Sequence, residues 1–181
     1  VQIPAGAARV DLAGKTVMPA IVDTHTHVPT TREALVELLQ RKAYYGVAAV
    51  ASFGQDTGDV AFQVREEVVP DGAMLRTAGR GITMPEPGRT EAPYWVTDEA
   101  EARKAVQELA ARKVDFVKIW VDDRDGKYKK LTPALYGAII DEAHKHGLRV
   151  AVHATDLQVA KDLLRAGIDV FAHMIADVDD E

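Results

Sequence analysis

The chain has 181 residues, 47% hydrophobic and 28% charged, so it can bury one core and has the composition of a globular protein. Its net charge of −6 gives no reason to expect nucleic acid or an anionic membrane as a partner. There is no cysteine, which excludes disulfides, thiolate metal ligands and a cysteine nucleophile, so any metal must be held by histidine, carboxylate or a modified lysine.

The first half of the chain alternates apolar segments with segments of helical spacing. In order, these predict a strand remnant over 1–16, a strand over 17–28, a helix over 31–45, a strand over 47–53, a helix over 59–69 and a strand over 73–78. Residues 79–93 hold three glycines and three prolines and predict a long loop. Loops of that length in a compact domain are usually functional or disordered.

The second half repeats the same unit. A helix is predicted from Thr97 or Asp98 to about residue 113, followed by a strand over 113–121, a helix over 133–146, a strand over 148–154, a helix over 156–166 and a strand over 168–174. Strands that alternate with helices through short, glycine-ended links indicate βα units and a parallel sheet. In such folds the carboxyl ends of the strands carry the active site.

Histidines stand at several of these strand ends. His25 and His27 are two apart on a strand, so they face the same way and can chelate a divalent cation. His153 and His173 each lie six residues after the glycine that ends the preceding helix, where the apolar strand is about to end. Either of these two alone is more often a core histidine, but together at matched strand ends the four indicate a metal site.

Other polar residues are interpreted as structural or ambiguous. His144 and His146 lie in the last turn of a predicted helix, where a cationic ring favours the helix dipole, and are interpreted as caps. Residues 122–126 lack the length and the closing glutamate of a calcium loop and predict a polar turn. Lys118 lies inside an apolar strand, where a charged amine is costly unless it is neutralised or paired, for example with Asp115.

Residues 14–27, Gly-Lys-Thr-Val-Met-Pro-Ala-Ile-Val-Asp-Thr-His-Thr-His, resemble the first-strand signature of the amidohydrolase superfamily. The later Val-Asp-Phe-Val-Lys-Ile, its Asp-rich turn and a helix ending His-Gly-Leu are similar to the imidazolonepropionase-like and Xaa-Pro dipeptidase-like group. This resemblance implies an α/β fold of the (β/α)8 TIM-barrel type, truncated to about six βα units. Residues 17–181 would be the partial barrel, and residues 1–16 the remnant of a small β-sandwich domain.

The resemblance also implies a function: an amidohydrolase-type metallohydrolase that cleaves amide, peptide-like or cyclic C–N bonds. It implies two divalent metal ions, with zinc favoured, held by His25, His27, Lys118, His153 and His173, and a metal-bridging hydroxide as nucleophile. In this group the lysine on strand 4 is carbamylated and bridges both ions, which implies a carbamate on Lys118. A buried amine near cations has a depressed pKa and can react with carbon dioxide, which suits that role.

Strands 7 and 8 are missing from the predicted order, and the group's general acid/base aspartate belongs to strand 8. Asp177, Asp179 and Asp180 are interpreted as solvated charges, so no catalytic acid–base residue is assigned. The chain is therefore expected to be a fragment, weak or inactive by itself. Its unpaired barrel edges are expected to cause self-association.

Two other functions stay open: a mononuclear metal-dependent deaminase of the same fold, with Lys118 structural, or a non-catalytic truncated barrel that acts as an oligomerising or binding module. The expected partner is a small-molecule amide or dipeptide-like substrate, with neither nucleic acid nor membrane. No apolar run approaches the roughly 20 residues of a membrane span, and no signal-peptide pattern is present, which favours the cytoplasm. Export stays open because the chain begins at Val1.

Overall fold

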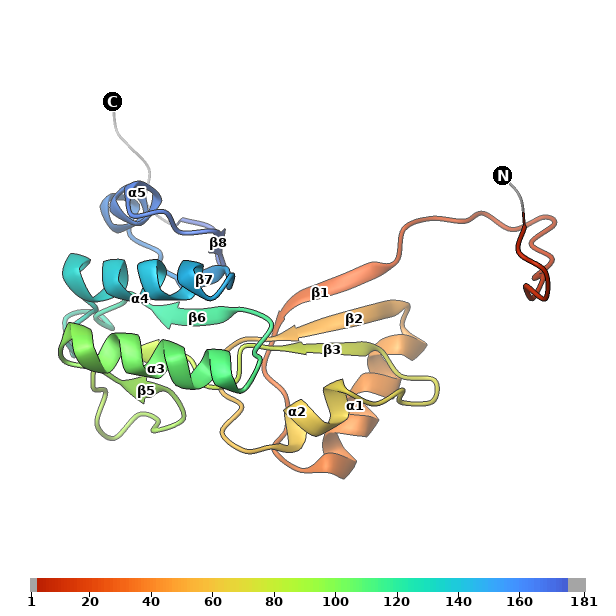
Figure 1. The fold of residues 1–181 in the computed structure, drawn as a ribbon, viewed down its shortest axis with the longest axis horizontal. Coiled ribbons are helices and arrows are strands. Elements are labelled where there is room, and N and C mark those ends of the chain that lie inside the picture. Colours follow the sequence, from red (N-terminus) through yellow and green to blue (C-terminus); the bar gives the residue numbers. More distant parts are fainter. Residues whose placement is uncertain (1–2, 176–181) are drawn as a thin grey trace.

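A computed structural model describes residues 3–175, in which strands and helices alternate along the chain except that three strands follow one another between residues 74 and 95 (Figure 1). The strands are β1 (Ile21–Thr26), β2 (Val47–Ser52), β3 (Met74–Thr77), β4 (Ile82–Thr83), β5 (Tyr94–Trp95), β6 (Val117–Trp120), β7 (Val150–His153) and β8 (Val170–Phe171). The helices are α1 (Arg32–Tyr44), α2 (Val60–Arg65), α3 (Glu99–Ala111), α4 (Pro133–Lys145) and α5 (Leu157–Arg165). Every pair of neighbouring strands is parallel.

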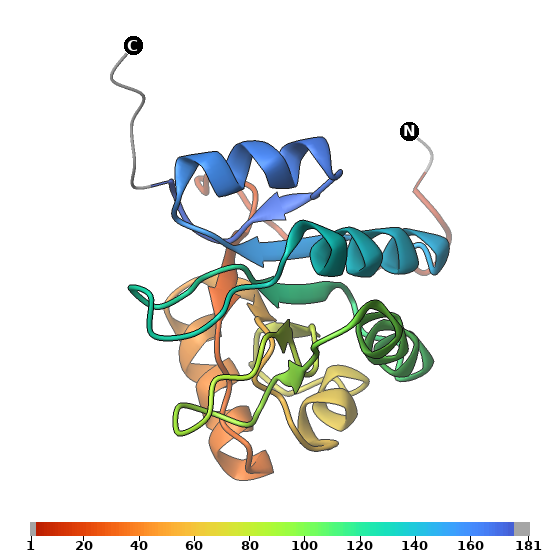
Figure 2. The same cartoon turned by 90° about the vertical axis from the view of Figure 1, so that its left-hand side faces the viewer.

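The strands form two sheets, with the orders β1-β2-β3 and β5-β4-β6-β7-β8. The two sheets are linked at Asp115, whose backbone N–H donates to the Thr77 carbonyl at 2.9 Å and whose carboxylate accepts from the Thr77 N–H at 2.8 Å. Apart from β4 and β5, the strands therefore follow one another in the order β1, β2, β3, β6, β7, β8. Figure 2 shows β6, β7 and β8 of the five-stranded sheet side by side, in green to blue.

Each sheet buries an apolar cluster beneath its helices. Leu35 and Leu39 of α1 pack with Val50 of β2 and Leu75 of β3, and all four are almost completely buried. A larger cluster joins α3 and α4 to the five-stranded sheet; its fully buried members include Val106, Val117, Ile119, Ile139, Val150 and Val152. Burying such a side chain stabilises the fold by about 1.5–3 kcal/mol, so these clusters fix the strands that carry the histidines.

The amino-terminal segment differs from the expectation. Residues 3–20 contain no helix or strand, so the strand remnant predicted over 1–16 is not seen in the described part of that range. The strand predicted from residue 17 begins only at Ile21, and Val17 and Met18 are 74% and 69% exposed. Pro19 has no N–H to donate to a strand ladder, which explains the late start. The division of the chain at residue 16 stays a prediction.

The segment predicted as a long loop contains a short strand. β4 pairs in parallel with β6, with Ile82 opposite Ile119. A Cβ atom on Gly81 would lie 2.1 Å from the Trp120 ring and 3.1 Å from the Lys118 carbonyl, so glycine lets this backbone approach β6. Within residues 3–175 no helix is long and apolar enough to cross a membrane.

Candidate active site

Four histidines form a row at the carboxyl ends of β1, β7 and β8. The ring centroids of His27 and His25 are 5.4 Å apart, those of His25 and His173 are 4.7 Å apart, and those of His173 and His153 are 4.6 Å apart. His173 follows two residues after β8, which ends earlier than predicted, at Phe171. The contact between His25 and His173 brings together the first and last strands of the succession. The sequence-predicted histidines are thus neighbours in the fold.

The four imidazoles are held in their neutral form. Loss of water lowers the pKa of His25 to about 4, and the nearby charge of Lys118 acts in the same direction. Desolvation also lowers the pKa of His27 and His173, again with Lys118 as the second cause. Desolvation lowers the pKa of His153 too, although its hydrogen bond with Asp122 opposes the shift. A neutral imidazole is the form that binds metal ions, so this row is suited to ligation near pH 7.

Lys118 is fully buried beside this row, and its Nζ atom has no hydrogen-bond partner in residues 3–175. The ammonium lies 5.0 Å from the ring centroid of Phe53 and 5.3 Å from that of Trp120. Desolvation, followed by the charge of Arg124, lowers the pKa of Lys118 to about 7. The amine is therefore partly neutral and nucleophilic at physiological pH.

The alternative prediction, a salt bridge between Lys118 and Asp115, is wrong. The Asp115 carboxylate lies 3.2 Å from Arg65 and 3.4 Å from Arg76, and it accepts from the Thr77 N–H. These contacts hold the Asp115 carboxylate at the junction between the two sheets. The Lys118 side chain lies beside the histidines and forms no ion pair with Asp115.

Sequence reasoning missed a group of charged residues that contacts His153. The Oδ2 atom of Asp122 lies 2.7 Å from Nε2 of His153, and the guanidinium of Arg124 binds the same carboxylate oxygen. Nε of Arg124 lies 3.2 Å from the buried carboxylate of Glu86. Burial by itself would raise the pKa of Asp122, but hydrogen bonds from the Arg124 N–H and from His153 lower it.

The turn that holds Asp122 and Arg124 is polar, as predicted, but it reaches into the site. A signal for it was available, because the turn directly follows the strand of Lys118, on the side where parallel folds place their active sites. Glu86 gave no such signal, since it comes from the loop over 79–93. Its position depends on how that loop runs over the sheet.

His144 and His146 lie outside the row, as predicted. His144 is 2.9 Å from Asp169 and His146 is 3.6 Å from Glu142, both at the carboxyl end of α4. Asp177, Asp179 and Asp180 lie outside the described residues. The predicted ligands are therefore separated in space from the predicted caps.

The side chains at the row fit a divalent metal ion by their chemistry. Imidazole nitrogens are common zinc ligands, and Lys118 Nζ is a buried polar atom without a partner. Among residues 3–175, however, no three His, Cys, Asp or Glu side chains are placed so that they could hold a metal ion as they stand. At His153, Nε2 is already engaged by Asp122.

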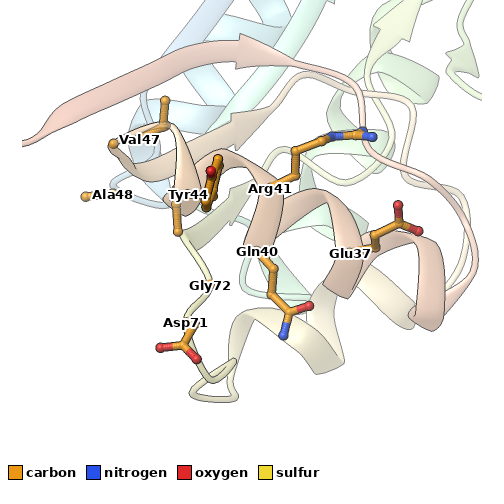
Figure 3. Close-up of a pocket in the computed structure, with 10 residues that line it drawn as sticks. Glu37, Gln40, Arg41, Tyr44, Val47, Ala48, Asp71 and Gly72 are labelled. Atoms are coloured by element: carbon orange, nitrogen blue, oxygen red, sulfur yellow. The ribbon is translucent and has the colours of Figure 1, made fainter.

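Two hollows differ in their relation to the row. A cavity of about 450 Å³ opens beside His25 and Phe53 and also reaches Arg76, Asp115 and Arg149; its size is in the range of small-ligand sites. A larger hollow of about 850 Å³ lies at the amino end of β2 (Figure 3). It is lined by Glu37, Gln40, Arg41, Ala43, Tyr44, Gly46, Val47, Ala48, Asp71 and Gly72. The amino ends of parallel strands serve stability, and the smaller cavity also extends to such ends, because Asp115 and Arg149 precede β6 and β7. What distinguishes the smaller cavity is that His25 of the row lines it.

Comparisons with known proteins support an amidohydrolase-like fold. No family model matches the chain. The enamidase of Eubacterium barkeri is 24% identical over 184 residues, which cover 93% of this chain and 45% of the enamidase. A protein assigned as a prolidase from Bifidobacterium longum is 26% identical with a TM-score of 0.75, over 94% of this chain and 44% of that one. A Xaa-Pro dipeptidase is 24% identical with a TM-score of 0.67, over 84% of this chain and 47% of the dipeptidase.

An amidohydrolase that is only 18% identical still has a TM-score of 0.76, over 98% of this chain and 53% of that protein. The structural neighbours are thus amidohydrolase- and prolidase-like proteins, which confirms the resemblance seen in residues 14–27. The chain spans about half the length of these relatives. That share is consistent with the predicted fragment.

Proposed function

We propose that the chain is the metal-binding part of an amidohydrolase-type hydrolase that cleaves amide, peptide-like or cyclic C–N bonds in small molecules. One observation carries this proposal: neutral imidazoles from three strand ends meet beside a buried lysine whose amine has no partner. The similarity to an enamidase, a Xaa-Pro dipeptidase and an assigned prolidase supports the same bond class.

The proposed architecture is an arc of a (β/α)8 barrel, in which β1, β2, β3, β6, β7 and β8 would be the first six barrel strands. The parallel order β1, β2, β3, β6, β7, β8 supports it, as does the contact between His25 and His173 at the two ends of the arc. Residues 1–16 are proposed as the remnant of a small sandwich domain. In such a barrel an aspartate on the eighth barrel strand, which is not the strand labelled β8 here, would be the general acid/base, so we expect the 181-residue chain to be weak or inactive.

His25, His27, His153, His173 and Lys118 would hold two divalent ions, for which zinc is the first choice. Bound metal ions would supply Lewis acidity and acidify water at this site. Lys118 would contribute as a carbamate. Its neutral amine would attack the carbon of carbon dioxide, an N–C bond would form as one C–O π bond breaks, and one N–H proton would pass to solvent, which leaves an anion with two ligand oxygens. The partly neutral amine, with its pKa of about 7, supports this reaction.

The side chains around Lys118 keep water away from its amine. Phe53 and Trp120 cover the amine with aromatic faces and exclude water from it. The cavity beside His25 would accept a small amide or dipeptide-like substrate, with its apolar wall formed by Phe53 and Phe116. The positions of these side chains support a substrate of that size.

The test is metal content by elemental analysis, on chain purified without chelators and dialysed against zinc and bicarbonate. We expect two equivalents of zinc in the wild-type chain and one or none in Lys118→Ala, with His144→Ala as the matched control that keeps two. One equivalent that is insensitive to Lys118→Ala would instead favour the mononuclear deaminase. Zinc content at background in all three proteins would overturn the proposed site.

A further inference from the structure

We infer that Asp122 is a positioning residue for His153, and that Glu86 from the loop over 79–93 holds this pair in place through Arg124. The inference concerns the site of the proposed hydrolase and rests on that proposal for its consequence in metal binding. Its structural part concerns only which ring nitrogen of His153 carries the proton.

The contacts of Asp122 determine that proton. Oδ1 of Asp122 accepts from the backbone N–H of Arg124 at 2.8 Å, and Oδ2 faces Nε2 of His153 at 2.7 Å. The Arg124 guanidinium also binds Oδ2, so the carboxylate is ionised and can only accept hydrogen bonds. Nη1 of Arg124, which can only donate, also lies 3.3 Å from Nε2 of His153, but the contact of Nε2 with the Asp122 carboxylate is the shorter of the two. The N–H is therefore assigned to Nε2, which leaves the lone pair of Nδ1 for a metal ion.

Arg124 is held in turn by the long loop. Its backbone φ of +56°, followed by +59° at Asp125, is a conformation that non-glycine residues adopt rarely and at a cost. The fully buried Glu86 pairs with Arg124 at 3.2 Å and with Arg89 through its other oxygen. The Tyr128 hydroxyl also donates to the Pro87 carbonyl at 3.1 Å, so loop and turn are joined twice. A buried carboxylate without a partner would be strongly unfavourable, which keeps this connection intact.

A second carboxylate–histidine pair in the chain serves for comparison. His144 and Asp169 lie 2.9 Å apart, but the His144 side chain is 43% exposed and sits at the end of α4. The His153 side chain is 17% exposed and lies in the row. A carboxylate that orients a metal-binding histidine typically contributes 10–100-fold to metal affinity, and this role is open only to Asp122 of these two carboxylates.

The direct test is nitrogen-15 NMR of the imidazole rings in the full chain, free of metal, at neutral pH. We expect the His153 ring of the wild type to carry its proton on Nε2. In Asp122→Asn, the amide oxygen should keep the Arg124 N–H, so the NH2 group would face Nε2 and the proton should move to Nδ1. Asp123→Asn is the matched control, because Asp123 is the neighbouring carboxylate and caps the Gly126 N–H; it should leave His153 unchanged.

A wild-type His153 protonated on Nδ1 would overturn the inference, as would a folded Asp122→Asn variant that keeps the Nε2 proton. If Asp122→Asn does not fold, Glu86→Gln gives the second measurement, and we expect it to produce a mixture of the two tautomers. An unmixed Nε2 form there would overturn the role of Glu86. The His144 signal should not change in any variant.

Zinc affinity separates this inference from the proposed function. We expect Asp122→Asn to lose about 10–100-fold in zinc affinity and Asp123→Asn to lose none. Equal affinity in both variants would overturn the positioning role. Absence of zinc binding in every protein, the wild type included, would overturn the proposed function, while the tautomer of His153 would still decide the inference.

Discussion

Lys118 is an amine buried without a partner, and its cost should be measurable as a pH dependence of stability. The pKa is about 7 in the folded chain against an ordinary value of 10.5, so between these limits the unfolded chain binds more protons than the folded chain. The free energy of unfolding should therefore rise with pH from about 7 to about 10.5, by at most about 1.4 kcal/mol per pH unit from this group.

The measurement is urea unfolding of the wild type and of Lys118→Met at pH 7, 8.5 and 10 in buffers free of carbon dioxide. Methionine keeps most of the side-chain volume and removes the charge, so the variant should be more stable than the wild type at pH 7. The difference should shrink as the pH rises. A constant difference across this range would show that the lysine is not deprotonated in the folded chain.

At the scale of single residues, the sequence predicted the four histidines and Lys118 as candidate metal ligands, because each was placed near the end of an apolar strand. It did not predict Asp122, Arg124 and Glu86 as site residues. The two left-handed residues of the turn at Arg124 and Asp125 direct the guanidinium towards His153, and such backbone angles leave no periodic signal. Glu86 depends on the course of a loop that local patterns do not encode.

At the scale of elements, glycines decide how closely the segment of β4 lies on β6. Gly81→Ala would place a Cβ atom 2.1 Å from the Trp120 ring, beside the backbone of Lys118. We expect it to destabilise the fold by about 1–3 kcal/mol, since the ring and the strand must move apart. Gly137→Ala is the control: it lies in α4 with no atom within 4 Å of the added Cβ, and it should stabilise by about 0.5–1 kcal/mol.

Thermal and urea unfolding of both variants would check this prediction. A Gly81→Ala chain as stable as the wild type would mean that β4 can move away from β6 at no cost. In that case the short strand would have no part in positioning Lys118. Equal losses in both variants would point instead to a general intolerance of alanine.

The elements themselves could be predicted more completely than their ends. The alternation of apolar segments with glycine-ended helices predicted the order from β1 to β8, apart from the short β4 and β5. Helix α2 ends at Arg65 rather than at residue 69, and β8 ends at Phe171 rather than at residue 174. These limits depend on which neighbour a residue can pair with. β4 was missed because its pairing with β6 needs Gly81, and glycine in sequence indicates a loop.

At the scale of the whole chain, the open ends of the strand succession are apolar. β1 pairs only with β2 and β8 only with β7 among the described strands, so each has an unpaired edge. Ile21 and Val22 on β1 are 53% and 51% exposed, and Val170 on β8 is 39% exposed. Unpaired strands with exposed apolar side chains favour pairing with another chain. We therefore propose that the isolated chain associates with itself through β1 and β8.

The prediction is a molar mass that rises with concentration in sedimentation or light scattering, between about 5 and 500 μM. Val22→Glu should shift the equilibrium towards the monomer by at least about tenfold, since a charge on an exposed strand edge opposes edge-to-edge pairing. Val68→Glu is the matched control. Val68 is 94% exposed but lies between α2 and β3, away from both edges, so its variant should associate as the wild type does.

The two outcomes have different meanings for the site. If Val22→Glu dissociates the chain and lowers zinc content with it, the neighbouring copy helps to keep β1, and with it His25 and His27, in position. If the variant is a monomer that binds zinc as the wild type does, the contact between His25 and His173 is sufficient to join the two ends of the succession. A wild-type chain that stays monomeric up to 500 μM would exclude edge pairing. The arc would then be stable with its edges open, because the clusters under the helices outweigh the cost of the exposed strands.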